Sequence, residues 1–260
     1  MAVTNFIQQI WSKKIQDDLE LKCKLVDNCL RDYEGDCKYA QSVKILGVGE
    51  PTIGAYDGTK DITIEDMSDK GQILTIDQAN YFAFYVDDVD QAQSVPGLKE
   101  KYQEKAVHGL AVARDTYVAT LIASATNATP IEAMTEEGVK KAVDAAIVAL
   151  RERNFDEDGV IEMTPAFYSL FKNHLITLST NNPELIRKGV VGMYDNFECI
   201  MSNNLKTPCD IRGKKAIAFA GQINEVEALR AEKRFKDIVR GLDTFGAKII
   251  DEARIQKLTA

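Results

Sequence analysis

The chain has 260 residues, 45% of them hydrophobic, so it can bury the core of one large domain or of two smaller ones. Its 40 acidic residues outnumber the 32 basic ones and give a formal net charge of -8, which excludes a general electrostatic attraction to nucleic acid phosphates. No window approaches the ~18 uninterrupted apolar residues of a membrane helix, and no apolar signal core opens the sequence, so we expect a soluble cytoplasmic product.

The first forty residues predict an amphipathic helix followed by an extended connection. Apolar side chains recur at helical spacing among many charges, at Phe6, Ile10, Trp11, Ile15 and Leu19. Residues 32–41, which follow, have no such stripe. The apolar face of the predicted helix needs a partner, and we interpret Phe6 and Trp11 as apolar anchors rather than as a ligand-stacking pair.

From Val43 the pattern changes to that of β-strands. Two runs, VKILGVG and TIGAY, precede a polar, glycine-bearing stretch at 57–71, and two more, ILTID and YFAFYV, follow it. We interpret them as two pairs of strands in a long protruding hairpin with a polar tip. Because a lone hairpin is marginally stable in water, its exposed edges invite pairing with another chain.

A long helix is predicted from Leu98 to Ser124, directly after a Pro-Gly pair. At ~1.5 Å per residue it is about 40 Å long, the length of a whole domain. From Leu110 to Ala123 it is apolar almost all round, so other elements must enclose this half. Its apolar stripe consists of Leu98, Tyr102, Ala106, Leu110, Ala113, Tyr117 and Leu121.

Residues 125–130 are rich in turn-forming residues and mark the best internal boundary. Beyond them helices and strands alternate, which indicates a compact α/β or α+β unit. One of the helices has Thr164 as its N-cap and Pro165 as its first residue. In chain order the elements are a helix over 135–153, a strand over 160–163, the helix from Pro165, and a hairpin of 189–194 and 197–202 across Asp195 and Asn196.

The chain closes with AIAFAG at 216–221, VEALRAEKRF at 226–235 and DIVRGLDTFGAKIID at 237–251, and it ends in a short helical tail. Over 226–234 the propensities are divided. Alternation there favours a strand, whereas the content of Ala, Glu and Arg favours a helix.

Three carboxylates, Asp87, Asp88 and Asp90, follow the aromatic strand at 81–86 without a loop. They fit a catalytic or metal site, because carboxylate oxygens are ligands of hard cations. Such a site needs several convergent ligands, however, and the sequence offers no matching second cluster. We therefore interpret these acids as marking the point where a strand leaves its sheet.

Residues 154–165 come nearest to a known metal-binding motif. Asn154, Asp156 and Asp158 stand at positions one, three and five of a calcium-binding EF-hand loop, with Gly159 at six. Position twelve, which should be a bidentate Glu, is Pro165. We therefore expect a helix-to-strand turn rather than tight calcium binding.

Other candidate motifs fail on spacing or on number, and we predict no catalytic, cofactor-binding or metal-binding residue. GLDTFGAK at 241–248 imitates a phosphate-binding loop, but its lysine falls one place late, and GVGEPTIG at 47–54 misses the G-x-G-x-x-G spacing. Only His108 and His174 occur, which excludes a His-rich metal centre.

The cysteines are odd in number and form no C-x-x-C pair, which predicts buried free thiols. They are Cys23, Cys29, Cys37, Cys199 and Cys209.

Five segments together resemble the major capsid proteins of tailed bacteriophages, in that family's order. Each segment is weak alone, but five in register over nearly the whole chain argue against coincidence. They are FIQQIW at 6–11, DYEGDCKYAQSVKILGVGEPTIGAYDG at 32–58, LTIDQANYFAFYVDDVDQAQS at 74–94, NFDEDGVIEMTPAFYSLF at 154–171 and KRFKDIVRGLDTFGAKII at 233–250.

The resemblance implies an α+β fold, the Hong Kong 97-like capsid fold, in which a long spine helix joins the peripheral part of the subunit. It also favours a strand for 226–234. The implied division is an N-terminal arm at 1–42, an extended β-hairpin loop at 43–86, a peripheral domain at 87–125 and 215–260, and an axial domain at 126–214.

As to function, the resemblance implies a structural coat subunit with no enzymatic activity, cofactor or metal. Such subunits assemble into the pentamers and hexamers of an icosahedral head around double-stranded DNA, which they enclose without sequence-specific binding. The arm and the hairpin would lie over neighbouring subunits. The subunit would be made in the host cytoplasm, end in the virion and touch no membrane, with portal, decoration and separate scaffolding proteins as expected partners.

Two alternatives stay open at the level of sequence. An encapsulin-type cargo compartment shares the same fold, and a metal-dependent enzyme that uses the acids at 87–90 belongs to a different class. Some members of the family cross-link their shells by a Lys-to-Asn isopeptide bond. Lys60 and Lys70 lie near the expected loop tip, but no Asn occurs in 225–260, so we predict no such bond.

Overall fold

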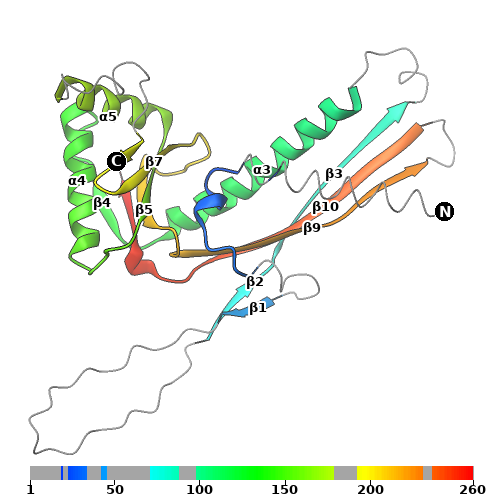
Figure 1. Cartoon of the computed structure of the whole chain (residues 1–260), viewed down its shortest axis with the longest axis horizontal. Helices are drawn as coiled ribbons and strands as arrows, with labels where there is room; N and C mark the ends of the chain where they lie inside the picture. The colour runs from blue at the N-terminus through cyan, green and yellow to red at the C-terminus, as the bar shows by residue number, and fades with distance from the viewer. Residues whose placement is uncertain are drawn as a thin grey trace, which may run out of the picture.

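The structure is a computed structural model of the chain. It describes residues 19, 23–33, 42–45, 71–87, 98–178, 192–230 and 236–259. In this part of the chain a compact α+β unit lies at one end, and a long helix runs beside a long three-stranded sheet that extends away from it (Figure 1). None of the described helices is long and apolar enough to cross a membrane.

A six-stranded mixed sheet forms the compact unit, in the order β4-β11-β8-β5-β7-β6. The pairs β4–β11 and β5–β7 are parallel, and the other neighbours are antiparallel. The strands are β4 (Ala128–Pro130), β5 (Gly159–Met163), β6 (Met193–Tyr194), β7 (Phe197–Met201), β8 (Cys209–Gly213) and β11 (Ile255–Thr259).

Two helices, α4 (Glu136–Arg151) and α5 (Pro165–Leu178), pack against one face of this sheet. Ile161 of β5 and Ile211 of β8 are Cα partners on that face and are fully buried under the helices. The start of α4 follows from its cap, because the Oγ1 atom of Thr135 accepts a hydrogen bond from the backbone N–H of Gly138 at 3.2 Å. The intervening residues of β5 and β8 point to the opposite face of the sheet.

The predicted hairpin across Asp195 and Asn196 is confirmed. Strands β6 and β7 pair antiparallel with these two residues between them, at φ angles of 50° and 70°. Two consecutive left-handed residues form the two-residue turn whose twist matches that of paired strands, and Asp and Asn tolerate this conformation better than most residues. The predicted helices and the strand at 160–163 are confirmed as α4, α5 and β5.

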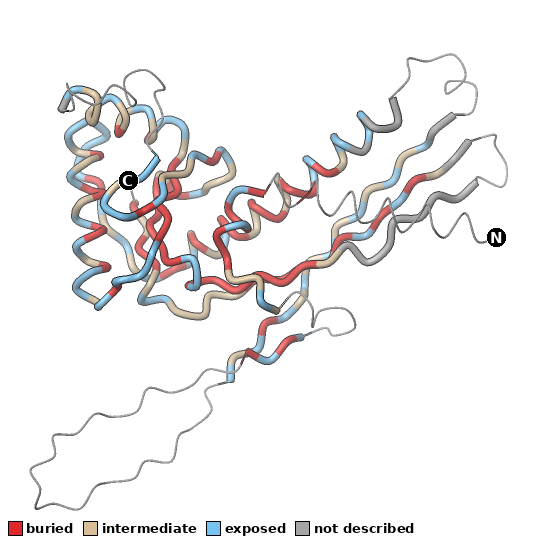
Figure 2. Tube along the Cα trace, in the orientation of Figure 1, coloured by how far each residue is buried: buried red, intermediate tan, exposed pale blue. Residues whose placement is uncertain are grey.

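The three-stranded sheet has the order β3-β10-β9 and is antiparallel throughout. Its strands are β3 (Gln78–Asp87), β9 (Ile217–Arg230) and β10 (Lys236–Ile249). The strand that the resemblance favours for 226–234 is confirmed as far as Arg230, and residues 231–235 lie outside the described part. Strand β3 forms one edge of the sheet, and Figure 2 shows that its described residues are exposed or half-buried along its length.

Helix α3 (Leu98–Ser124) begins and ends where the sequence predicts. Its buried face is rotated from the predicted stripe, because Val107, Ala111, Val118 and Ile122 are buried whereas Tyr102 is 45% exposed. The reason is that α3 packs against the N-terminal segment, residues 23–33, as well as against the sheet, so its hydrophobic core includes residues from both. This core lies on the far side of the six-stranded sheet from α4 and α5.

A two-stranded sheet of β1 (Ser42–Ile45) and β2 (Gln72–Thr75) confirms the base of the predicted hairpin. Val43 and Leu74 are Cα partners, and both are buried against Ala218 and Ala220 of β9. The predicted strands at 47–56 and the predicted tip lie outside the described residues.

Two predictions are wrong, namely the strand partner of the aromatic run and the helical tail. The aromatic run at 81–86 does not pair within the hairpin, because the whole of β3 pairs with β10 instead, from Gln78 opposite Phe245 to Asp87 opposite Lys236. The ring of Phe82 fills the space where Gly241 has no side chain, which favours this pairing.

The predicted helical tail is wrong as well, since its last residues form β11. β11 lies between β4 and β8, so residues 255–259 belong to the six-stranded sheet. The 3-10 turn at Glu252–Arg254 is the only helical portion of this tail among residues 250–259. Burial of Ile255 and Leu258 in the sheet outweighs the weak helical propensity of so short a segment.

Candidate functional sites

The three acids that first suggested a metal site are only partly described. Asp87 is the last residue of β3 and lies opposite Lys236 of β10, whereas Asp88 and Asp90 lie outside the described residues. Within the described ranges, no three His, Cys, Asp or Glu side chains are close enough to hold a metal ion. The interpretation that these acids mark a strand end is consistent with where β3 stops.

The loop that imitates an EF-hand forms the predicted helix-to-strand turn between α4 and β5. Asn154 adopts a φ of 60° at this turn. Two of the carboxylates bind protein groups, since Asp158 accepts a hydrogen bond from Asn196 at 2.9 Å and Glu157 pairs with Arg254 at 2.8 Å. The loop thus joins neighbouring elements of the compact unit.

The segment at 241–248 is not a phosphate-binding loop, because it lies inside β10 and pairs with strands on both sides. Its lysine, Lys248, donates a hydrogen bond to the carbonyl of Ile73 at 2.9 Å. The second candidate loop, at 47–54, lies outside the described residues. A strand interior offers no free backbone N–H groups for a phosphate, so the resemblance to the motif is accidental.

The histidines and the cysteines behave as ordinary structural residues. His108 is exposed on α3, and His174 is half-buried on α5. Of the cysteines that the structure describes, Cys23, Cys29 and Cys209 are buried, Cys199 is half-buried, and all four are free. Burial raises the pKa of the Cys29 thiol to about 11, so this group is uncharged near neutral pH. The prediction of buried free thiols is confirmed for three of them.

An exposed apolar face on the three-stranded sheet is the first feature that the sequence did not reveal. Tyr81 and Tyr85 of β3 are 80% and 64% exposed, and Leu242, the Cα partner of Tyr81 on β10, is 40% exposed. All three lie on the sheet face opposite Phe82, whose ring covers Gly241. Arg240, the Cα partner of Ala83, lies among them on the same face. Exposed aromatic side chains around an arginine are typical of a surface that another protein covers.

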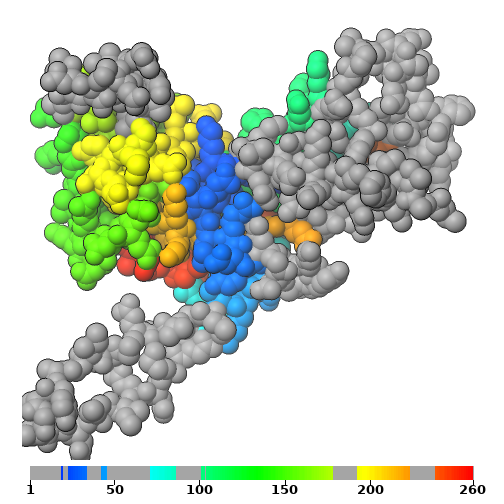
Figure 3. Space-filling view, viewed as in Figure 1, coloured from blue at the N-terminus to red at the C-terminus, as the bar shows by residue number. Residues whose placement is uncertain are grey.

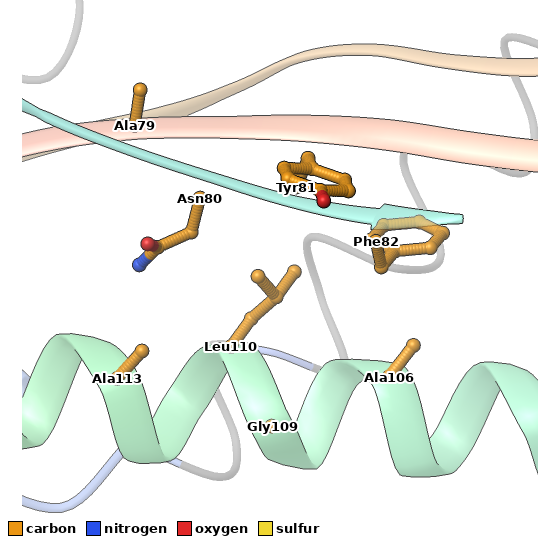
Figure 4. A pocket seen from close by; sticks show the side chains of 8 residues that line it. All are labelled: Ala79, Asn80, Tyr81, Phe82, Ala106, Gly109, Leu110 and Ala113. Atoms are coloured by element: carbon orange, nitrogen blue, oxygen red, sulfur yellow. The ribbon is translucent and has the colours of Figure 1, made fainter.

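On the opposite face of the sheet, which Asn80 and Phe82 share, a pocket of about 430 Å³ separates the edge strand β3 from α3. Figure 4 shows Asn80 and Leu110 pointing into it from the two elements, whereas Ala79 points away from α3. Because β3 has no strand partner on this side among the described residues, its backbone groups and the pocket lie next to each other. The pocket is apolar and contains no titratable pair, so it offers a place for packing rather than for catalysis.

A buried ion pair joins α3 to β10. The Nε atom of Arg114 donates to the Oδ2 atom of Asp243 at 3.0 Å, and both side chains are almost fully buried. The guanidinium also lies over the rings of Phe219 and Phe245, at 5.5 and 5.8 Å from their centres. Asp243 is the Cα partner of Asn80, whose side chain points towards α3 in Figure 4, so strand alternation places Asp243 on the sheet face that α3 covers.

The N-terminal segment is held by charges at both ends of its 3-10 turn (Val26–Asn28). On the α3 side, the carboxylate of Asp115 accepts hydrogen bonds from the backbone N–H groups of Lys24, Leu25 and Val26, at 3.1 to 3.3 Å. A carboxylate at the start of a helical turn and a cation at its end both match the turn's dipole. Burial raises the pKa of Asp115, although these hydrogen bonds act in the opposite direction.

The cation at the other end of the turn is Arg212 of β8. Its guanidinium donates to the carbonyls of Leu25 and Asn28 at 2.9 and 2.8 Å, and it binds both carboxylate oxygens of Glu162 of β5. In the space-filling view the segment (dark blue) lies against the yellow and orange residues of the neighbouring strands (Figure 3). The segment therefore connects α3 to the six-stranded sheet, and we call these contacts of residues 23–33 with Asp115 and Arg212 the joint.

Sequence reasoning missed these buried charges, although each left a signal. Arg114 and Asp115 interrupt the apolar half of α3, and Glu162 and Arg212 stand inside apolar strands. A charge within an apolar run indicates a buried partner, since an unpaired buried charge is too costly. The partner itself comes from another element, which the sequence does not place.

The sequence matches no protein-family model, and no curated protein is significantly similar to it. Solved structures, in contrast, match over nearly the whole chain. A structure from Mycobacterium phage Che8 has a TM-score of 0.77 at 24% identity and covers 91% of this chain and 90% of its own. The capsid of cyanophage P-SCSP1u has a TM-score of 0.73 at 16% identity, over 89% and 86%.

A virus-like particle from Pyrococcus furiosus is also similar, with a TM-score of 0.61 at 14% identity over 97% of this chain and 99% of the other. At these identities the likenesses establish the fold. The chain has the Hong Kong 97-like capsid fold, which confirms the fold class that the sequence predicts.

Proposed function

We propose that this protein, which has the Hong Kong 97-like capsid fold, is the major capsid subunit of a tailed bacteriophage. It assembles into the pentamers and hexamers of an icosahedral head that encloses double-stranded DNA. The observation that carries the proposal is the match of nearly the whole chain, rather than of one domain, to the capsid of cyanophage P-SCSP1u and to the structure from phage Che8.

In this function the subunit acts through its contacts and not through a catalytic group. The face of Tyr81, Tyr85 and Leu242, together with the free edge of β3, supports this view, because both are surfaces that a neighbouring subunit can cover. Shell subunits commonly bury more than ~2,000 Å² in such obligate interfaces.

We further propose a division of the chain into functional parts, adjusted to the observed strand pairing. The N-terminal arm comprises residues 1–42, and the extended loop comprises about 43–77, since β3 belongs with β10. The peripheral domain then consists of 78–125 and 215–254, and the axial domain of 126–214 and 255–260.

The net charge of -8 suits a container for nucleic acid. A wall that repels the polymer lets it slide and pack, whereas an attractive wall would hold it. We place the mature protein in the virion, after synthesis in the host cytoplasm, with scaffolding, portal and decoration proteins as partners. Strong binding of the isolated subunit to duplex DNA at physiological salt would count against this part of the proposal.

Electron microscopy of the expressed full-length chain tests the function. Closed shells, or rings of five and six subunits, support it. A persistently monodisperse monomer whose turnover of a substrate depends on a metal would favour the enzyme alternative.

A protein-filled compartment is the second candidate, and the near-complete overlap with the virus-like particle from Pyrococcus furiosus favours it specifically. The content of particles purified from the native source distinguishes the two. Double-stranded DNA inside the shell supports the phage head, and a single packaged protein in place of DNA supports the compartment.

A further inference from the structure

The buried charges beneath the N-terminal segment do not balance. Glu162 of β5 is the Cα partner of Asp210 of β8, and Arg212 stands two residues further along β8, so all three share the sheet face opposite α4 and α5. All three are fully buried. Two ionised carboxylates and one guanidinium would leave a net negative charge in a site without water, which is costly.

Arg212 already uses its donors on other groups. Its Nε and Nη2 atoms bind Glu162 at 3.1 and 2.7 Å, and its Nη1 and Nη2 atoms bind the carbonyls of Asn28 and Leu25. The nearest approach of Asp210 to this guanidinium is 4.0 Å, and among the described residues no N–H or O–H group donates to either oxygen of Asp210. Asp210 therefore lacks the donors that a buried carboxylate needs.

The charged groups of the surrounding elements do not supply the missing cation. Lys257 of β11 is the Cα partner of Asp210, but its Nζ atom donates to the carbonyl of Ala123 near the end of α3 at 2.7 Å. Lys24 of the N-terminal segment donates to the carbonyl of Met201 at 3.2 Å. Asp115 of α3 adds a further negative charge on the other side of the segment.

The thiols near this site do not offset the net negative charge of the two carboxylates and the guanidinium. Cys209 precedes Asp210 on β8, and Cys29 lies beside the guanidinium of Arg212, with its Sγ atom at 3.7 Å from Nη1. Burial raises the pKa of both thiols, so they stay protonated near neutral pH. With the groups that the structure describes, only a proton on one of the two carboxyl groups brings the site to electrical neutrality.

We propose that Asp210 carries a proton that it shares with Glu162, and that this proton completes the joint by which Arg212 holds the N-terminal segment against the sheet. Burial first, and then the neighbouring charge of Glu162, raise the pKa of Asp210 well above its usual value. Loss of the proton sets a second carboxylate against Arg212, in competition with the carbonyls of Leu25 and Asn28. The joint therefore loosens as the pH rises.

The sign of this dependence follows from the direction of the pKa shift. Between the ordinary pKa of an Asp, about 3.9, and the raised pKa of the folded state, the folded protein binds one proton more than the unfolded protein. Stability therefore falls as the pH rises through that window. One such proton changes an opening equilibrium by up to about tenfold per pH unit.

Hydrogen exchange of the unassembled full-length chain tests the proposal, and it does not depend on whether shells form. The amides of Cys29 and Leu30, which donate to the carbonyls of Val26 and Ile217, report on the joint. In the wild type we expect their protection factors to fall by up to about tenfold per pH unit as the pH rises from 5. Asp210→Asn, which is neutral at every pH, should keep the protection and lose the dependence.

Asp156→Asn is the matched control, since it removes an exposed carboxylate of the same unit and should leave the wild-type dependence intact. Equal pH dependence in the wild type and in Asp210→Asn would overturn the proposal.

A second measurement uses only the wild-type protein, so it does not depend on whether a variant folds. Infrared spectroscopy of the wild type at pH 7 should show the carbonyl band of a protonated carboxylic acid, and the absence of such a band would also overturn the proposal.

Discussion

At the residue scale, the buried charges connect elements that are distant in sequence. Arg114 joins α3 to β10, and Arg212 joins β8 to β5 and to the N-terminal segment. A buried ion pair adds little to stability when compared with a well-packed apolar pair, but breaking it leaves one charge unpaired. These residues therefore specify how the elements are placed more than they stabilise the fold.

Replacing Arg114 by Met should lower the free energy of unfolding by ~3–5 kcal/mol, because Asp243 becomes an uncompensated buried carboxylate. Urea denaturation of the full chain measures this change. Replacing both residues, by Arg114→Met and Asp243→Leu, should cost less because no charge stays unpaired. Lys141→Met removes an exposed ion pair with Glu132 and should leave the urea midpoint of unfolding unchanged. A loss from Arg114→Met no larger than that of this control would contradict the role of the pair.

At the element scale, the end of β2 lies directly against β10. An added Cβ at Gly246 would stand 2.1 Å from the carbonyl oxygen of Thr75 and 2.9 Å from the Cα atom of Ile76, which are both backbone atoms. The Nε2 atom of Gln72 and the Nζ atom of Lys248 add hydrogen bonds between the same two elements. The close contact fixes how β2 lies on β10.

Gly246→Ala should therefore destabilise the chain by ~1–3 kcal/mol and displace β2 from β10, since backbone atoms cannot move aside as a flexible side chain does. Calorimetry measures the stability, and exchange of the β2 amides reports the displacement. Gly109→Ala in α3 has no atom within 4 Å of the new Cβ, so it should stabilise the chain slightly instead. An equal loss of stability in both variants would show that the backbone contact at Gly246 is not its cause.

The elements also show what the sequence alone predicts. The bounds of α3 and the β6–β7 hairpin follow from local signals, namely the apolar period of a helix and an Asp-Asn turn. The pairing of β3 with β10 and the place of β11 do not, because an apolar, β-forming run fits many partners and only the tertiary structure selects one. The buried charges follow the same rule, since their positions were visible in the sequence and their partners were not.

At the scale of the whole molecule, the chain exposes Tyr81, Tyr85 and Leu242 on one face of β3 and β10, and exposed aromatic side chains are typical of a surface that another protein covers. Tyr81→Lys combined with Tyr85→Lys places two charges on this face without touching the core. We expect the double variant to keep the circular dichroism and the melting temperature of the wild-type subunit and to lose assembly. Met134→Lys, at a 48% exposed position in the loop before α4, is the control. Equal loss of assembly in the control would show that the effect is not specific to the β3–β10 face.

The central claim, that the chain is a shell subunit, is tested most directly by cryo-electron microscopy of the expressed wild-type protein. We expect closed particles with icosahedral symmetry, built from rings of five and six copies, in which the face of Tyr81, Tyr85 and Leu242 is covered by a neighbouring copy. A protein that stays monomeric at every concentration and salt condition, or particles in which this face remains open to solvent, would contradict it.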